Sequence, residues 1–137
     1  MTVNNGENDY GVSFGRIMFL QKIIESNDAV VITSRHDDIV FEIDRPKFGD
    51  HLTVVCIDTY TASLEQVMRI VSDFPNANII FVGGKWNGYT REAFDFCVSK
   101  KIGLYNAGEI SGGLYRKDFW SYEKFDEEGE TLRTIKG

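Results

Sequence analysis

Hydrophobic residues in the first part of the chain change from a helical to a strand-like spacing. Ser13 is placed to cap a helix that ends near Asn27, because the apolar residues between them recur every three or four positions. Residues 1–12, which precede this helix, are mostly polar and are predicted to be flexible. Three runs rich in β-branched residues follow, at residues 29–33, 39–43 and 52–59. The short polar segments between these runs, the first of them residues 34–38, predict a three-stranded antiparallel meander.

The middle of the chain alternates between helix and strand patterns. Ser63 and Gln66 have the spacing of a capping box, which predicts a helix over residues 63–74. The continuous apolar run at residues 79–82 is typical of a strand covered on both faces. Thr90 can cap a third helix, and residues 102–105 are predicted to form the last core strand. This strand–helix–strand order requires a right-handed crossover and a parallel pair of strands.

Together these elements predict an α/β or α+β fold with a mixed five-stranded sheet flanked by helices. The length of 137 residues accommodates one domain, since domains usually contain about 100–150 residues. Residues 13–110 are predicted to form its core, and residues 111–137 an extension of the same domain that contains a short helix or strand and then a hairpin. The aromatic residues of this extension either pack against the core or form a protein interface: Tyr115, Phe119, Trp120, Tyr122 and Phe125.

Composition and charge narrow the classes of partner. The chain has 42% hydrophobic and 26% charged residues, as in ordinary soluble globular proteins. Its net charge of -6 opposes a broad phosphate-binding surface, which depends on Lys and Arg, so a protein partner is expected in preference to nucleic acid. No apolar run approaches the roughly 20 residues that span a bilayer. The first residues also lack a signal-peptide pattern, and these features predict a cytoplasmic protein without membrane contact.

Residue types that serve as nucleophiles or soft metal ligands are sparse. Cys56 and Cys97 are far apart and show no CxxC spacing, so we expect reduced, buried thiols rather than a disulfide or a zinc site. His36 and His51 fall in turn-like segments, which predicts surface roles for both. Neither histidine has a serine or cysteine nucleophile placed beside it by the sequence.

Three segments within residues 37–110 carry a family resemblance: DDIVFEI, HLTVVCIDTYTASLEQV and ANIIFVGGKWNGYTREAFDFCVSKKIGLYNAGEI. Together with the order of elements, they resemble the core of the PD-(D/E)XK restriction-endonuclease-like superfamily. The last segment is similar to the closing part of Mrr-type nuclease domains. The resemblance extends from residue 13 to about residue 110, and it implies an αβββαβαβ core of the restriction-endonuclease-like kind.

The resemblance also implies where a catalytic site would lie. In that family an Asp at the start of the second strand and an acidic residue on the third bind a divalent metal, and a Lys two positions later activates water. Asp38, or its neighbour Asp37, matches the first carboxylate. On the third strand, either Cys56 takes the acidic position and Asp58 that of the lysine, or Asp58 is the acid and Tyr60 replaces the lysine. Both registers lack the lysine, which implies a degenerate, inactive site.

Other interpretations of these carboxylates stay open. Glu42 and Asp44 repeat the same acidic spacing on the second strand, so Asp38, Asp58 and Glu42 form the candidate metal ligands, for Mg²⁺ or Mn²⁺ if the chain is a nuclease. Otherwise no cofactor is expected. Alternatively, the aspartates only flank hairpin turns, where their side chains form local hydrogen bonds.

The segment GGKWNGYT joins the buried strand at residues 79–82 to the third helix. At such a junction backbone amides and the helix dipole can receive an anion, although the sequence fits neither GxxxxGK[ST] nor GxGxxG. Gly84, Lys85 and Thr90 are the candidate anion-binding residues. Trp86 is instead the anchor if the turn contacts a protein partner, and the remaining alternative is a turn that merely exposes it.

These observations lead to a functional prediction. We predict a non-catalytic, nuclease-fold binding or regulatory module that acts through a protein partner, in a phage–host or nucleic-acid-processing setting that the resemblance alone suggests. One alternative is a divalent-metal-dependent nuclease with an atypical site at Asp38 and Asp58. The other is a small nucleotide-binding α/β domain.

Overall fold

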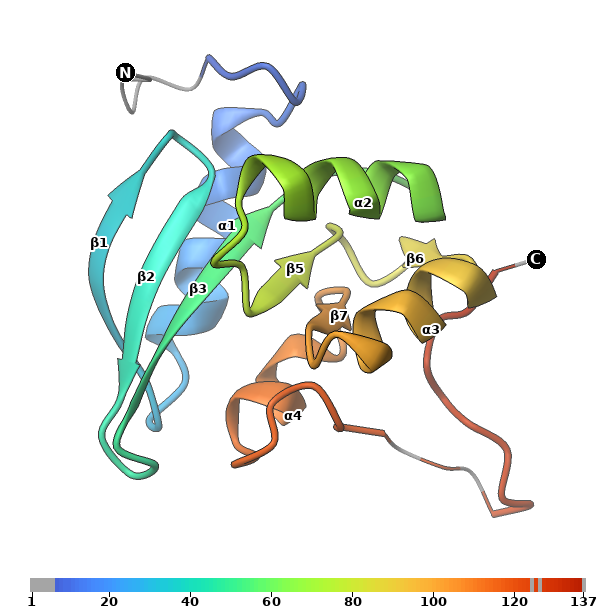
Figure 1. Ribbon diagram of the computed structural model, residues 1–137. Coiled ribbons are helices and arrows are strands. Elements are labelled where there is room, and N and C mark those ends of the chain that lie inside the picture. Colours follow the sequence, from blue (N-terminus) through green and yellow to red (C-terminus); the bar gives the residue numbers. More distant parts are fainter. Residues whose placement is uncertain (1–6, 124, 126, 137) are drawn as a thin grey trace.

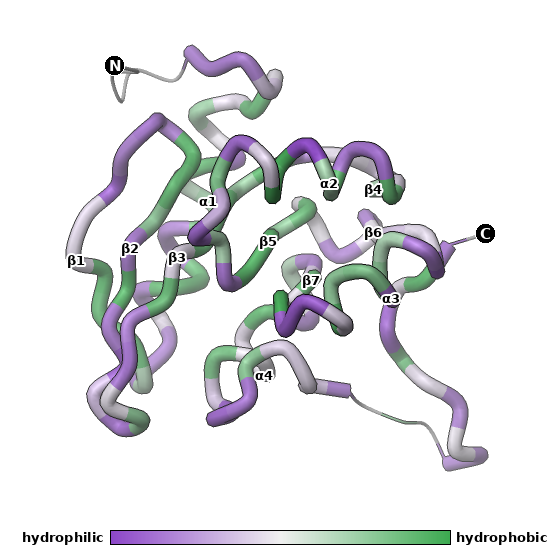
Figure 2. The backbone as a smooth tube through the Cα atoms, viewed as in Figure 1, coloured by the Kyte–Doolittle hydropathy of each residue, from purple (hydrophilic) through white to green (hydrophobic). Residues whose placement is uncertain are grey.

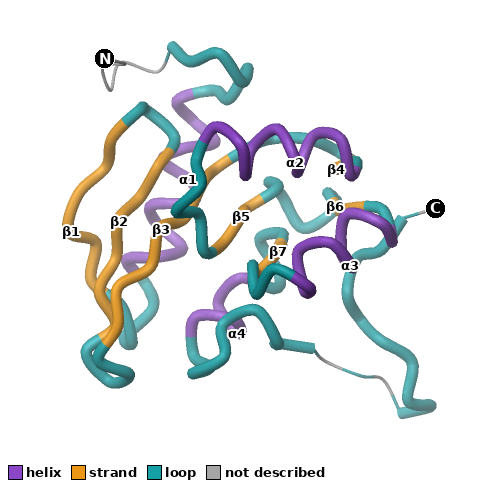
Figure 3. Tube along the Cα trace, viewed as in Figure 1, coloured by secondary structure: helices purple, strands orange, loops and turns teal. Residues whose placement is uncertain are grey.

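The computed structural model describes residues 7–123, 125 and 127–136. In this part of the chain the helices are α1 (Phe14–Glu25), α2 (Leu64–Asp73), α3 (Arg91–Ser99) and α4 (Ile110–Leu114) (Figure 1). The strands are β1 (Val31–His36), β2 (Val40–Arg45), β3 (Asp50–Cys56), β4 (Thr61–Ala62), β5 (Ile79–Phe81), β6 (Gly88–Tyr89) and β7 (Gly103–Tyr105). The described residues form an α+β fold in which a five-stranded mixed sheet is combined with these four helices (Figure 3).

The main sheet combines an antiparallel and a parallel half. Its strand order is β1-β2-β3-β5-β7. Strands β1, β2 and β3 pair antiparallel, whereas β5 pairs parallel with β3 and β7 parallel with β5. Helices α2 and α3 provide the two crossovers between the parallel strands. The meander and the parallel unit predicted from the sequence are therefore confirmed.

The three predicted helix starts are confirmed by their capping hydrogen bonds. Ser13 Oγ accepts from the Arg16 backbone N–H at 3.1 Å, and Ser63 Oγ accepts from the Gln66 N–H at 3.1 Å. Thr90 Oγ1 caps α3 in the same way. Such caps satisfy backbone donors that have no partner within the helix. None of the helices in the described residues has the length and apolar character needed to cross a membrane.

Helices lie on both faces of the sheet. In Figure 1, α1 passes behind the strands, whereas α2 and α3 lie in front of the β5–β7 half. The ring of Phe19 on α1 lies 6.4 Å from that of Phe81 on β5, and Phe81 pairs with Cys56 on β3. Paired residues share a face, so the side chains of Phe81 and Cys56 face α1. The front of the β1–β3 meander has no helix over it in Figure 1, and Figure 2 shows hydrophilic residues along these strands.

The β1–β2 turn is tighter than the sequence predicted. We expected residues 34–38 to form the connection, but β1 continues to His36 and only residues 37–39 form the turn, among them Asp37 and Asp38. Both residues have positive φ angles, 49° and 66°. A short hairpin connection uses such left-handed conformations, which Asp adopts more readily than most residues. His36 therefore lies on β1. His51 lies on β3, and both positions correct the assignment of the two histidines to turn-like segments.

A second, smaller sheet was not predicted. Strands β4 and β6 pair in parallel, and Ile135 near the C-terminus forms a parallel bridge with Tyr89 of β6. Helix α4 contains two glycines and was not located from the sequence. The hairpin expected in the extension is present as a single antiparallel bridge between Phe125 and Thr131. Of the aromatic residues in the extension, Phe119 is buried against the core, whereas Tyr115 and Phe125 are exposed.

Residues 7–12 contact the core. The predicted flexible segment includes residues 1–6, which lie outside the described residues. In the remainder Val12 is buried, and Asn8 donates from Nδ2 to the Val12 carbonyl oxygen at 2.8 Å. The hydroxyl of Tyr10 donates to Asp73 on α2 at 2.7 Å. These contacts fasten the segment before α1 across the end of the sheet.

Candidate functional site

The first candidate carboxylate, Asp38, is buried and bound by its own chain. It lies in the β1–β2 turn, where Arg35 Nη1 is 3.0 Å from its Oδ1 and also donates to its carbonyl oxygen at 2.8 Å. Asn8 donates from Nδ2 to Asp38 Oδ2 at 2.8 Å. Both carboxylate oxygens therefore have donors, and a guanidinium compensates the charge. This arrangement agrees with the interpretation of Asp38 as a turn residue.

The second candidate, Asp58, lies two residues after β3. Arg16 of α1 places Nε 3.3 Å from Asp58 Oδ1, and Asn87 donates from Nδ2 to the same oxygen at 3.2 Å. Gly83, with a φ of 119°, permits this approach because a Cβ there would lie 2.7 Å from the same Asp58 oxygen. Like Asp38, Asp58 is paired with an arginine and an amide.

The thiol of Cys56 is buried close to both aspartates. Burial raises the pKa of the Cys56 thiol far above its usual range, and the negative charges of Asp58 and Asp38 raise it further. Burial likewise raises the pKa of Cys97 to about 12. Both cysteines are free and buried, as predicted. A thiol in this state is protonated at neutral pH and is a poor nucleophile and metal ligand.

The third candidate, Glu42, lies on the opposite face of the sheet from Cys56. Glu42 pairs with Thr53 across β2 and β3, and alternate residues of a strand point to opposite faces. It therefore cannot join Asp38 and Asp58 around one ion. Throughout the part of the chain that the structure describes, no three His, Cys, Asp or Glu side chains are arranged to hold a metal ion.

Glu42 is instead the centre of a histidine–carboxylate network on the front of the meander. Its Oε2 lies 2.6 Å from His36 Nε2, and its Oε1 lies 2.7 Å from His51 Nε2. Through Nδ1, His36 contacts Asp37 at 2.6 Å and His51 contacts Asp44 at 2.7 Å. Each imidazole thus bridges two carboxylates, which favours the doubly protonated ring because both nitrogens are then donors.

These contacts shift three pKa values. Burial alone would lower the pKa of His36, but hydrogen bonds to Glu42 and Asp37 outweigh it and raise the pKa above its usual value. Hydrogen bonds to Asp44 and Glu42 raise the pKa of His51. Burial would raise the pKa of Glu42, but hydrogen bonds from His36, Thr53 and His51 outweigh it and lower that pKa.

The directions of these pKa shifts define the pH range in which the network stabilises the fold. A raised histidine pKa contributes stability below about pH 6.5, which is lost as the pH rises through the folded-state pKa. A lowered glutamate pKa contributes stability above about pH 4.3, which is lost as the pH falls through the folded-state pKa. Both contributions are therefore present together between about pH 4.3 and pH 6.5.

Residues 82–87 form a loop between β5 and β6. The loop exposes Trp86, as predicted, and hydrogen bonds hold its backbone in place. The Trp86 side chain is 75% exposed. Asn106 directs Nδ2 toward the carbonyl oxygens of Lys85 and Asn87, at 3.1 and 2.9 Å. The Asn87 N–H donates to the Gly84 carbonyl oxygen at 2.9 Å, and Asn87 Nδ2 donates to that of Val82 at 3.0 Å. The loop therefore presents its tryptophan from a fixed backbone.

The candidate anion-binding residues separate into two groups in the structure. Gly84 and Lys85 lie together in the loop: a Cβ at Gly84 would lie 3.5 Å from Arg16 Nη1, and the Lys85 ammonium is 5.4 Å from the Trp86 ring centre. Thr90 is engaged as the cap of α3, since its Oγ1 accepts from the Ala93 N–H at 3.1 Å. The cationic side chains of Arg16 and Lys85 therefore lie beside the loop, whereas the Thr90 hydroxyl is engaged in capping α3.

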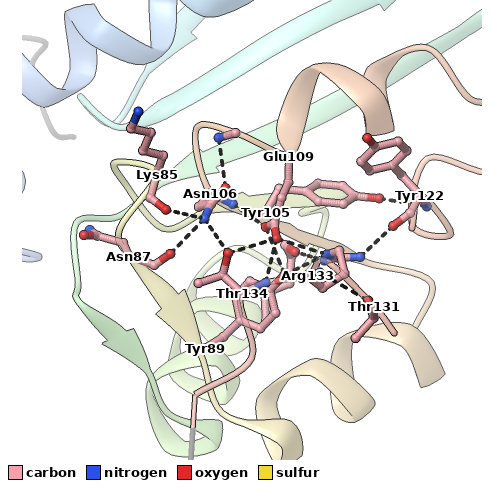
Figure 4. Close-up of polar contacts among 12 residues, drawn as sticks. Lys85, Asn87, Tyr89, Tyr105, Asn106, Glu109, Tyr122, Thr131, Arg133 and Thr134 are labelled. Carbon is pink, nitrogen blue, oxygen red and sulfur yellow. Dashed lines mark hydrogen bonds and ion pairs between the residues drawn. The ribbon is translucent and has the colours of Figure 1, made fainter. Parts of the chain in front are cut away.

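A buried polar network next to this loop was missed by the sequence analysis (Figure 4). Arg133 of the C-terminal segment donates from Nε to the Tyr89 hydroxyl at 2.7 Å and lies 3.5 Å from Glu109 Oε2. The Tyr89 hydroxyl donates to Glu109 Oε1 at 2.9 Å. Arg133 also donates to the carbonyl oxygens of Leu104 and Tyr122. No sequence signal identified the buried arginine.

The network continues from Glu109 to the loop. Glu109 accepts from the backbone N–H of Asn106 at 3.0 Å and from that of Thr134 at 2.8 Å. Asn106 Nδ2 lies 2.9 Å from Thr134 Oγ1, in addition to its two contacts with the loop carbonyls. Figure 4 shows these side chains converging from β6, β7, the loop and the C-terminal segment. The C-terminal segment is thereby connected to the backbone that presents Trp86.

Comparison with known proteins finds no family model, no curated protein and no solved structure that matches this chain.

Proposed function

We propose that this chain is a binding module with a restriction-endonuclease-like core that does not hydrolyse nucleic acid and acts through a protein partner. The order of elements supports the resemblance: a helix, an antiparallel meander, and two parallel strands reached through helical crossovers. The resemblance places Asp38 and Asp58 where a nuclease of that family has metal-binding carboxylates, so their surroundings bear directly on activity.

The observation that carries the proposal is the pairing of these two carboxylates with arginines. Asp38 contacts Arg35 at 3.0 Å, and Asp58 contacts Arg16 at 3.3 Å. The positive charge of a guanidinium compensates the negative charge that would attract a metal ion to the carboxylate. At Asp38 both carboxylate oxygens already accept hydrogen bonds, and at Asp58 the contacts of Arg16 and Asn87 converge on Oδ1, so a divalent ion would meet a carboxylate whose charge is compensated at each position.

The residue at the lysine position points to the same conclusion. In the register with Asp58 as the acid, Tyr60 takes that position, and its ring is exposed beside the Lys136 ammonium at 3.6 Å from the ring centre. A tyrosine side chain carries no positive charge in any protonation state, so it cannot replace an ammonium group beside a metal-bound water. The positive charge of Lys136 is directed at an aromatic ring.

A binding role is supported by the way the protein presents Trp86. Exposing a large aromatic side chain on a hydrogen-bonded loop lets a partner bury it without first ordering the loop. The loop backbone is held by Asn106 and Asn87, whereas the tryptophan itself is mostly exposed. This combination is typical of an interface anchor.

The test is a nuclease assay on the full chain. Labelled single- and double-stranded DNA and RNA are incubated with the protein in Mg²⁺ and in Mn²⁺, beside the variants Asp58→Asn and Asp38→Asn. Asp95→Asn is the matched control, because this aspartate is on the exposed side of α3. We expect no metal-dependent cleavage by any of the four proteins. Cleavage by the wild type that is lost in Asp58→Asn and retained in Asp95→Asn would refute the proposal.

A further inference from the structure

Five side chains form one surface at the carboxyl end of β3 and β5. They are Arg16, Tyr60, Lys85, Trp86 and Lys136, and we refer to them as the Trp86 surface. Arg16 reaches the Gly84 end of the loop, and Lys136 reaches the Gly88 end, where a Cβ would lie 3.0 Å from its Cε. The Gly88 N–H donates to the Tyr60 carbonyl oxygen at 2.8 Å, which joins Tyr60 to the same end.

The surface combines exposed aromatic rings with positive charge. The side chains of Trp86 and Tyr60 are 75% and 66% exposed. The ammonium groups of Lys85 and Lys136 lie 5.4 and 3.6 Å from the centres of these rings. Arg16 contributes a third positive charge, and its ion-pair partner Asp58 contributes one negative charge. Two net positive charges therefore surround two aromatic rings in a chain whose net charge is -6.

This pattern defines the chemistry of a ligand. An apolar side chain can pack on Trp86, while carboxylates of the same ligand lie near the lysines, where opposite charges steer association and select the partner. A nucleic acid fits less well, because its phosphates continue in both directions past the surface and would meet the acidic remainder of the protein. A short acidic segment concentrates its charge where the cations are.

We propose that the Trp86 surface binds an acidic segment of a partner protein that contributes an apolar anchor residue. This inference depends on the proposed function only in that both require a protein partner. Trp86 supplies the contact area, and Lys85 and Lys136 select for acidic residues on either side of it. Asn106 keeps the loop in the bound shape before the partner arrives.

The first part of the experiment is a selection that leaves the ligand sequence free. A phage-displayed library of random twelve-residue peptides is enriched on the immobilised full chain, and the same library is enriched on Trp86→Ala. We expect the wild type to select peptides with net negative charge and at least one large apolar residue. Failure to enrich any peptide, or enrichment of neutral or basic peptides, would overturn the proposal.

The second part measures the selected peptide in solution. Fluorescence anisotropy of the labelled peptide should show binding at least tenfold weaker for Trp86→Ala, and weaker also for the Lys85→Glu/Lys136→Glu double variant. Tyr115→Ala, which removes another exposed aromatic ring, is the matched control and should bind within twofold of the wild type. Circular dichroism establishes that each variant is folded. Equal binding by Trp86→Ala and the wild type would place the peptide elsewhere and refute the assignment.

A third arm separates this proposal from its alternatives. A labelled twelve-nucleotide oligothymidylate is titrated under the same conditions, and we expect it to bind more weakly than the acidic peptide. Tighter oligonucleotide binding that depends on Trp86 would overturn the proposal in favour of nucleic acid. Metal-dependent cleavage in the nuclease assay would overturn the proposed function, whereas loss of the peptide result without cleavage would overturn only this inference.

Discussion

Replacing Arg133 with methionine tests whether the C-terminal segment is an integral part of the fold. The guanidinium side chain is 3% exposed, and its ion-pair partner Glu109 is 8% exposed. Methionine retains much of the side-chain length and apolar volume but removes the charge and every donor. The change therefore isolates the polar contribution, with little of the cavity that alanine would leave.

The magnitude follows from the groups that the substitution leaves behind. Glu109 keeps four neutral donors, the hydroxyls of Tyr89 and Thr134 and the backbone N–H groups of Asn106 and Thr134, but loses its compensating cation. The carbonyl oxygen of Leu104 loses a donor inside the protein. Removing one partner of a buried ion pair costs about 3–5 kcal/mol, because the other charge stays buried without compensation. We expect a loss of that size in the free energy of unfolding.

The assay is urea unfolding, followed by far-ultraviolet circular dichroism and by tryptophan fluorescence. Arg91→Met is the matched control, because Arg91 forms an exposed i,i+4 pair with Asp95 at 3.8 Å, and such pairs contribute less than about 1 kcal/mol. Glu109→Gln should partly rescue Arg133→Met, since it removes the orphaned charge. Equal stabilities of Arg133→Met and Arg91→Met, or fully additive losses in the double variant, would refute the reasoning.

Three further predictions concern other parts of the fold. Arg45→Met should lower the free energy of unfolding by about 1.5–3 kcal/mol in urea, because this buried guanidinium donates to three backbone carbonyls and pairs with the partly exposed Asp50; a loss below about 1 kcal/mol would contradict this. Gly88→Ala should loosen the C-terminal segment, since the new Cβ would lie 2.3 Å from the Thr134 carbonyl oxygen. Hydrogen exchange should become faster at the Tyr89 amide, which donates to that oxygen, and unchanged exchange would count against the contact. The difference in Tm between the wild type and His51→Asn should be largest near about pH 5.5 and decline toward about pH 8, because the raised histidine pKa contributes stability only while the ring is protonated. A difference independent of pH, measured by differential scanning fluorimetry, would show that the network carries no ionic stabilisation.

Local chemistry explains which elements were predictable. Ser13, Ser63 and Thr90 cap helices through hydrogen bonds to residues three positions later, so each signal is contained in a few neighbouring residues. The runs of β-branched residues located β1, β2 and β3 for the same reason. The boundaries of β1 were missed because Asp37 and Asp38 adopt left-handed conformations, and residues 34–36 could therefore extend the strand.

Non-local pairing explains what could not be predicted. Strands β4 and β6 contain two residues each, which is too few for any periodicity to be detected. Spacing along β2 made Glu42 a candidate ligand beside Asp38 and Asp58, but its pairing with Thr53 directs it to the other face. The partners of Arg133 come from residues 89, 104, 109 and 122, and only the folded chain brings them together.

Two features that the sequence did not predict, the small sheet and the buried arginine, shape the proposed binding surface. Asn106 Nδ2 has two hydrogens, and these are shared among the Lys85 and Asn87 carbonyls and Thr134 Oγ1. Thr134 reaches that position because its neighbour Arg133 is buried beside Glu109 and because the segment pairs with β6. Lys136, two residues further on, is placed over the Tyr60 ring by the same pairing. Docking of the C-terminal segment therefore completes the cation pattern around Trp86 and helps to hold the loop that carries it, so the stability of the fold and the geometry of the surface depend on one set of contacts.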